Sequence, residues 1–189
     1  MTTNINTTII TIYVDGSCRN NGSDFAQGGW AAVLENGQDQ LRISGSEQPT
    51  TNNRMELMAL IEGLKAIRRE NAHVRVFTDS KYVQKGCTEW LEGWKRNGWK
   101  RSDGKPVLNV DLWQELDALI QKHTIEFCWV KGHNGHPMNE LADRMATAAS
   151  HGRGVRVRTY AGNTGPVKQR LSGPGNVFTP PVAREKVSA

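Results

Sequence analysis

The sequence lacks a long apolar run and has few cysteines, and both absences narrow the classes of protein it can belong to. The apolar stretch at residues 9–14 is short, stops at Asp15 and follows no basic segment, so we expect neither a signal peptide nor a membrane span. Three cysteines, Cys18, Cys87 and Cys128, are odd in number and lack a Cys-x-x-Cys pair, which argues against a disulfide framework or a cysteine zinc site. We expect a cytoplasmic protein.

Charge is unevenly distributed along the 189 residues. Seven of the 24 Lys and Arg residues and one of the 19 acids follow Ser150, which leaves 17 basic and 18 acidic residues before it. Residues 81–105 hold seven basic residues against three acids. We therefore expect one domain at residues 9–150, a flexible start at residues 1–8 and a disordered, basic, Gly- and Pro-rich tail at residues 151–189. The net charge of +5 suits a polyanionic partner.

Hydrophobic periodicity predicts a mixed α/β sheet. Residues 9–15 read as a buried strand that ends in a turn at Gly16, followed by a polar loop at residues 17–28. Asn36-Gly37 predicts a hairpin, so the first three strands should form an antiparallel meander. The remaining pattern predicts strands at residues 74–78 and 125–130, and helices at residues 51–70, 80–95, 110–122 and 139–150.

Four carboxylates fall where a metal-dependent nuclease needs them. Asp15 and Asp79 each close a strand-like run, Glu56 opens a helix, and Asp143 borders the apolar face of another. Parallel strands present their carboxyl ends at one edge of a sheet, so both aspartates should face one crevice. Taken singly, each acid has a structural alternative: a turn-forming Asp, a Glu at a helix N-terminus, or a solvated acid paired with a base. Together they suit Mg²⁺, which prefers oxygen ligands.

The segments around the acids add two further candidates. His133 lies between glycines in Lys131-Gly-His-Asn-Gly-His-Pro, which suits a proton shuttle, although a surface-loop histidine or a zinc pair with His136 are alternatives. Tryptophans alternate with cations between residues 90 and 101, which suits either core packing or a nucleic-acid surface, and we expect both.

These residues and their order resemble bacterial type I ribonuclease H. The motifs that carry the resemblance cover residues 13–17, 50–57, 78–80, 109–113 and 129–137, with Asp143 after them. The resemblance implies a ribonuclease H-like fold, with a five-stranded mixed sheet in the order 3-2-1-4-5 and helices on both faces. It also implies hydrolysis of the RNA strand of RNA–DNA hybrids with two Mg²⁺ ions, or Mn²⁺ as a substitute, to give 3′-hydroxyl and 5′-phosphate ends.

The resemblance assigns roles to individual residues. Asp15 would bridge both ions, Asp143 would help to hold one, Glu56 and Asp79 would hold the other, and His133 would assist proton transfer or product release. Substrate contacts would come from the minor-groove asparagines, a DNA-phosphate pocket and a basic protrusion: Asn20, Thr51, Asn52, Asn53, Lys81, Trp90, Trp94, Lys95, Arg96, Trp99, Lys100, Arg101 and Asn109. Pro49 stands where relatives often have a pocket Arg, and Lys81 where a Gln is common.

We therefore expect a monomeric endoribonuclease with no membrane and no obligate protein partner. Two alternatives come from other classes: a non-catalytic hybrid-binding module, which would tolerate loss of an acid, and a DNA-processing nuclease of the same fold. The basic tail is expected to add non-specific phosphate contacts, or else to be inert.

Overall fold

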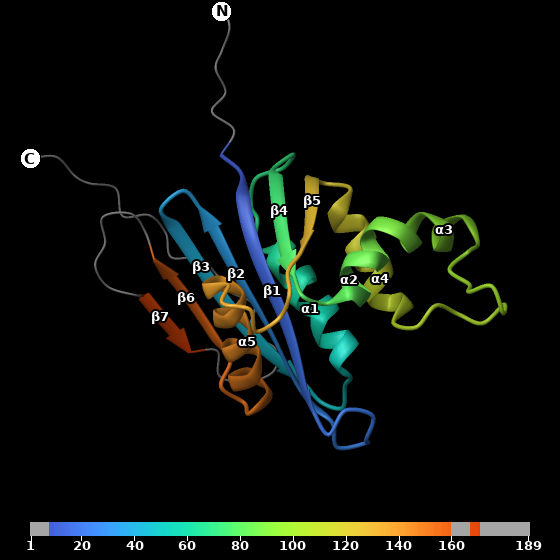
Figure 1. Ribbon diagram of the computed structural model, residues 1–189, viewed down its shortest axis with the longest axis horizontal. Coiled ribbons are helices and arrows are strands. Elements are labelled where there is room, and N and C mark those ends of the chain that lie inside the picture. Colours follow the sequence, from blue (N-terminus) through green and yellow to red (C-terminus); the bar gives the residue numbers. More distant parts are fainter. Residues whose placement is uncertain (1–7, 160–166, 171–189) are drawn as a thin grey trace, which may run out of the picture.

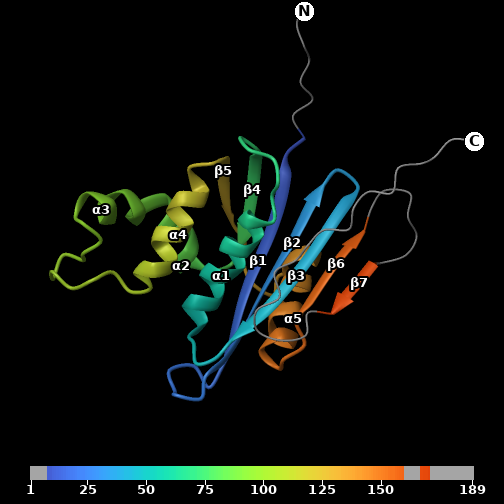
Figure 2. The same ribbon diagram turned by 180° about the vertical axis from the view of Figure 1, so that it is seen from behind.

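A computed structural model describes residues 8–159 and 167–170. Its core is one twisted sheet (Figures 1 and 2). The first three strands, β1 (Ile10–Arg19), β2 (Gln27–Asn36) and β3 (Asp39–Glu47), form the expected antiparallel meander, and β4 (His73–Thr78) and β5 (Thr124–Trp129) run parallel to β1. Five strands thus follow the predicted order 3-2-1-4-5, within a longer sheet of order β5-β4-β1-β2-β3-β6-β7.

Strand β1 is longer than the sequence suggested. The prediction that it ends in a turn at Gly16 is wrong, because β2 pairs with β1 as far as Arg19. On its other side β1 pairs with β4 only from Ile10 to Tyr13, so the two parallel strands separate beyond that point. The glycine serves close packing instead: a Cβ at Gly16 would lie 2.3 Å from the backbone nitrogen of Glu56.

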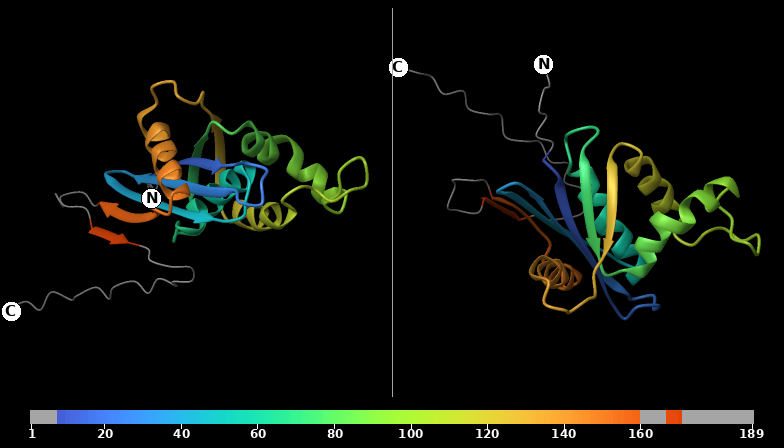
Figure 3. Two further views of the ribbon diagram at one scale, coloured as in Figure 1. Left: turned by 90° about the horizontal axis from the view of Figure 1, so that it is seen from below. Right: turned by 45° about the horizontal axis from the view of Figure 1, so that its top comes forward.

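Helices cover both faces of the sheet, as predicted. Helix α5 (Pro137–Ser150) lies on one face, and α1 (Asn52–Lys65) and α4 (Val110–Ile120) lie on the other (Figure 3, left). Helix α1 ends five residues before its predicted end; Ile67 still packs on the core, which explains why its spacing looked helical. None of the described helices is long and apolar enough to cross a membrane.

Residues 81–96 form a continuous helical segment that extends away from the sheet (Figure 1). It consists of α2 (Lys81–Lys85), a π-helical turn η1 (Gly86–Trp90) and α3 (Leu91–Arg96). Gly86 lies against the indole of Trp113, where a Cβ would come within 1.9 Å of the ring. The segment is therefore fixed to α4 by close aromatic packing.

The prediction that residues 151–189 are disordered is wrong for part of them. Strand β6 (Val155–Thr159) pairs antiparallel with β3, and β7 (Val167–Arg170) pairs antiparallel with β6. The sequence Val-Arg-Val-Arg-Thr alternates apolar and basic residues with period two, which favours a strand. The basic composition of the segment had instead favoured disorder. Other parts of the predicted tail, and residues 1–7, lie outside the described residues.

Candidate active site

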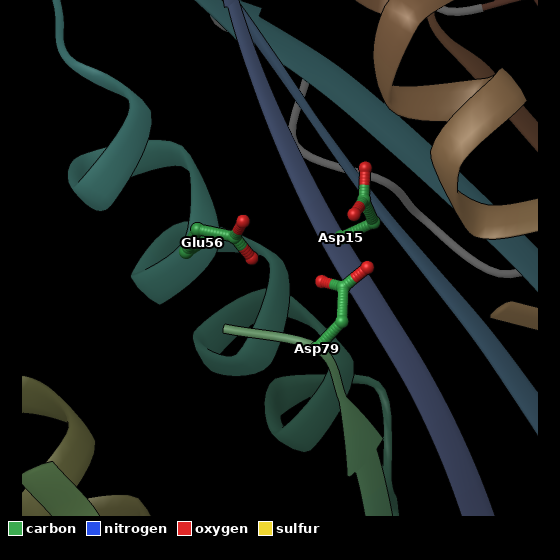
Figure 4. A group of neighbouring side chains, drawn as sticks. All are labelled: Asp15, Glu56 and Asp79. Atoms are coloured by element: carbon green, nitrogen blue, oxygen red, sulfur yellow. The ribbon is translucent and has the colours of Figure 1, made fainter. Parts of the chain in front are cut away.

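Three of the predicted acids meet at the point where β1 and β4 separate. One carboxylate oxygen from each of Asp15, Glu56 and Asp79 lies within 4.8 Å of the others. Figure 4 shows the three side chains converging from β1, α1 and the end of β4. Asp15 and Glu56 are only 6% and 5% exposed. We refer to these three residues as the acid triad.

The local sequence explains how Glu56 reaches the sheet. Gly16 has no side chain, so the first turn of α1 can pack directly on β1. The Gly16 N–H donates to the Glu56 carboxylate, and so does the side chain of Asn52. Thr51 caps the helix by accepting a hydrogen bond from the Arg54 N–H at 3.3 Å. The helix N-terminus is thereby held against the strand that carries Asp15.

The electrostatics of the acid triad favour a cation. Burial, followed by the charges of Asp79 and Asp143, raises the pKa of Asp15 to about 8. The pKa of Glu56 is also raised well above its ordinary value, by burial and then by Asp15 and Asp79, although its hydrogen bonds oppose the shift. One oxygen of Glu56 is buried and has no hydrogen-bond partner in the part of the chain that the structure describes. Such a set is costly without positive charge, so the residues present fit a divalent ion with oxygen ligands.

The fourth predicted acid lies beside this group rather than within it. Asp143 is half-buried on α5 and does not belong to the close acid triad. Its charge nevertheless contributes to the raised pKa of Asp15. The structure thus brings three acids together and places Asp143 at the rim.

Asp79 is held by contacts that the sequence did not reveal. The indole N–H of Trp129 donates to the Asp79 backbone carbonyl at 3.0 Å. The amide Nδ2 of Asn139 donates to its carboxylate at 3.3 Å. A Cβ on Gly132 would lie 2.6 Å from the same oxygen. Only a long-range pattern could have shown these contacts, because the partners are 50 to 60 residues apart in the chain.

The two loop histidines have different environments. His133 is exposed and has a positive φ of 52°. His136 packs its ring against Tyr13 and Phe77, with ring centroids 5.2 and 5.5 Å apart. The alternative of a zinc pair therefore has no support in the arrangement of the described residues, and the His133 side chain is open to solvent.

Comparison with known proteins decides the family. The sequence profile of the family described as RNase H matches residues 7–151. The chain belongs to the ribonuclease H family. The protein named Ribonuclease H from Cupriavidus necator is 57% identical over 137 residues, which cover 72% of this chain and 92% of that protein. Its counterpart from Marinobacter nauticus is 54% identical over 147 residues, 78% of this chain and 94% of that protein.

Two solved structures share the fold. LC9-RNase H1, described as a type 1 RNase H with the type 2 active-site motif, superposes with a TM-score of 0.72 at 35% identity, covering 87% of this chain and 79% of that one. A foamy viral protease-reverse transcriptase in complex with RNA/DNA hybrid has a TM-score of 0.63 at 21% identity, over 77% of this chain and 20% of that one. At that identity the second likeness shows the fold alone.

The predicted minor-groove residues gather at the N-terminus of α1. The side chain of Asn21 accepts a hydrogen bond from the Asn52 N–H at 3.1 Å, so the loop after β1 contacts the helix. Asn20, with a φ of 53°, and Asn53 are exposed. These residues of the ribonuclease H fold lie at the same end of α1 as Glu56.

The predicted phosphate-pocket residue Asn109 is held by hydrogen bonds around the Tyr82 hydroxyl. Its φ is 56°, and its Nδ2 donates to the Tyr82 hydroxyl at 3.2 Å. The same hydroxyl accepts a hydrogen bond from the Trp113 indole at 2.9 Å and donates to the Leu108 carbonyl. Arg54, the cation on the adjoining first turn of α1, is paired with Asp111 and Glu47.

The basic segment packs its tryptophans against the domain and leaves some of its cations exposed. Trp94 packs edge-on against Trp113 at 5.2 Å, and Trp90 packs against Trp94 at 5.6 Å, while Trp99 is half-buried on the core. The cations Arg96 and Lys100 are exposed. Two further cations form ion pairs: Lys95 with Glu92 and Asp117, and Arg101 with Asp103.

Lys81 belongs to a contact that sequence reasoning missed. Its Nζ lies 5.4 Å from the ring centroid of Trp129, and that indole is 44% exposed beside Asp79. An exposed tryptophan next to the acid triad offers a stacking surface. In the sequence, nothing distinguished Trp129 from the strand residues before it.

Proposed function

We propose that this chain hydrolyses the RNA strand of RNA–DNA hybrids at the acid triad, leaving 3′-hydroxyl and 5′-phosphate ends. Membership of the ribonuclease H family and the identical names of its relatives support this activity. The observation that carries the catalytic assignment is the convergence within 4.8 Å of three carboxylates, of which Asp15 and Glu56 are buried. A binding module would gain nothing from so costly a cluster.

Mg²⁺, with Mn²⁺ as a substitute, fits the donor set best because every ligand is a carboxylate oxygen. Asp15, Glu56 and Asp79 would hold the ions together with Asp143. When bound, two such ions supply an activated water and stabilise the leaving oxygen of a phosphodiester. The role of the protein is to hold these acids close together and oriented toward the ions.

Other residues would bind substrate and move a proton. We assign His133, on its exposed loop, to proton transfer or product release through a ring nitrogen. Asn20, Asn52 and Asn53 would contact the minor groove, where 2′-hydroxyls identify RNA. The exposed cations of the basic segment would hold phosphates of the DNA strand. We expect the chain to act as a monomer.

Cleavage of three labelled substrates tests this function. We expect the purified chain with Mg²⁺ to cut the RNA of a hybrid and to leave double-stranded and single-stranded RNA intact. Asp15→Asn should lose nearly all activity while still binding hybrid. Equal cleavage of double-stranded RNA, or an unchanged Asp15→Asn, would contradict the proposal. End-labelling of the products should find 5′-phosphates.

A further inference from the structure

Asn139 is a buried polar residue for which the proposed mechanism has no role so far. It lies in the first turn of α5, is 1% exposed, and donates from Nδ2 to Oδ2 of Asp79 at 3.3 Å. A carboxylate can only accept hydrogen bonds when ionised, so the amide nitrogen must be the atom that faces it. The contact joins α5 to the acid triad across 60 positions of sequence.

Packing alone does not account for an amide at this position. The carbonyl oxygen of Asn139 is buried and has no hydrogen-bond partner among the described residues. Leaving such an acceptor unsatisfied destabilises the fold. The buried residues that follow it along α5 are Ala142, Ala146, Ala149 and, at the end of the helix, Ser150. An apolar side chain of similar size would stabilise the fold better, so the amide must serve something else.

The neutrality of the Asn139 side chain is also informative. A further carboxylate here would add to the repulsion that already raises the pKa of Asp15. A lysine or arginine would neutralise Asp79 and compete with a bound cation. A neutral donor orients the carboxylate and leaves its negative charge available.

Asn139 also connects α5 to the acid triad. Asp143 is one turn further along the helix, and residues four apart share a helix face. The segment before α5 contributes the Trp129 indole and Gly132, which both contact Asp79. Backbone and carboxylate of Asp79 are thus held from one stretch of chain, residues 129–139, which also carries His133.

We propose that Asn139 is a positioning residue that orients the Asp79 carboxylate for a divalent ion. It also fixes the position of α5, and so of Asp143, relative to the acid triad. This inference rests on the proposed function, because it assumes that the acid triad binds such an ion. Hydrogen-bond partners of metal ligands typically contribute 10- to 100-fold to metal affinity or activity.

The experiment measures Mg²⁺ and Mn²⁺ binding by calorimetry to the full chain without substrate. Asn139→Leu keeps the size of the side chain and removes the donor, and Asn139→Ala provides a second variant if Leu disturbs packing. Both should bind the ions about 10-fold or more weakly. Ser150→Ala is the matched control: it removes a buried hydroxyl from the same helix, whose hydrogen bond goes to the Thr147 carbonyl. It should change the free energy of unfolding but not the metal affinity.

Kinetics on a hybrid supply the second readout. The Asn139 variants should lose kcat by about 10-fold or more with KM changed less than about twofold, because Asn139 would act through Asp79 and not through the hybrid. Metal affinities of both variants within about twofold of wild type would overturn the proposal, whatever happens to activity. If wild type binds the ions and cleaves no hybrid, the proposed function fails while the calorimetric comparison still decides the role of Asn139. Absence of ion binding by wild type would overturn both.

Discussion

Asp15→Asn should make the metal-free protein more stable while abolishing its activity. Two unit charges 4.8 Å apart repel each other by about 3.5 kcal/mol at an effective dielectric constant of about 20. Part of this repulsion is relieved by proton uptake and side-chain movement. We therefore expect the variant to gain about 2 kcal/mol in free energy of unfolding at a pH near 8 in the presence of a chelator.

The pH dependence of this gain follows from the direction of the pKa shift. The pKa of Asp15 is about 8 in the folded protein, above its ordinary value of 3.8. Ionisation is therefore more costly in the folded state than in the unfolded state, and the penalty grows as pH rises from about 4 to about 8. Below a pH of about 4 the carboxyl is protonated in both states, so the variant should gain nothing there. The three acids titrate as a coupled group, so the transition should be broad.

Urea denaturation from pH 4 to 9, with chelator or with saturating Mg²⁺, measures the effect. Saturating Mg²⁺ should stabilise wild type by mass action and cancel most of the advantage of the variant. Glu70→Gln is the matched control, since it removes an exposed carboxylate distant from the acid triad. A gain that is absent, independent of pH or unaffected by Mg²⁺ would refute the electrostatic account of the site.

Three further predictions concern packing, an ion pair and the added strands. Gly86→Ala should cost about 1–3 kcal/mol of stability by collision with Trp113, whereas Gly93→Ala, which has open space around it, should cost nothing in the same denaturation assay. Arg54→Ala should lose about 0.5–1 kcal/mol at neutral pH. Since Arg54 lowers the pKa of Asp111, that difference should shrink as pH falls below about 4 in thermal unfolding, and a constant difference would contradict it. Serine at the four basic positions of β6 and β7 should flatten the salt dependence of hybrid binding; an unchanged slope would make these strands inert toward substrate.

Much of the site could be predicted because the chemistry is local in sequence. Asp79 directly follows β4 as its apolar run predicts, and Glu56 lies near the start of α1, just beyond the first turn that Thr51 caps. Gly16 was misread because a glycine after an aspartate suits both a turn and a close approach of two backbones. Only the position of α1 distinguishes these cases, and that is a tertiary contact.

Contacts between distant segments were beyond sequence reasoning. Nothing in the residues around Asn139 indicates that its amide meets Asp79, because the meeting depends on how α5 crosses the sheet. The alternation of apolar and basic residues at 155–159 indicated a strand, but the basic, Gly- and Pro-rich composition of the tail indicated disorder. A strand of this kind gains its stability from the partner that it pairs with, here β3.

Pairing of β6 with β3 has a consequence for the solubility of shortened forms. In the full chain β3 is an interior strand whose N–H and C=O groups are bonded on both sides along residues 40–43. A chain that ended at Ser150 would return β3 to the edge of the sheet, where free backbone groups can recruit a second copy. Self-association of truncated forms would then reflect a lost neighbour strand rather than a damaged catalytic core.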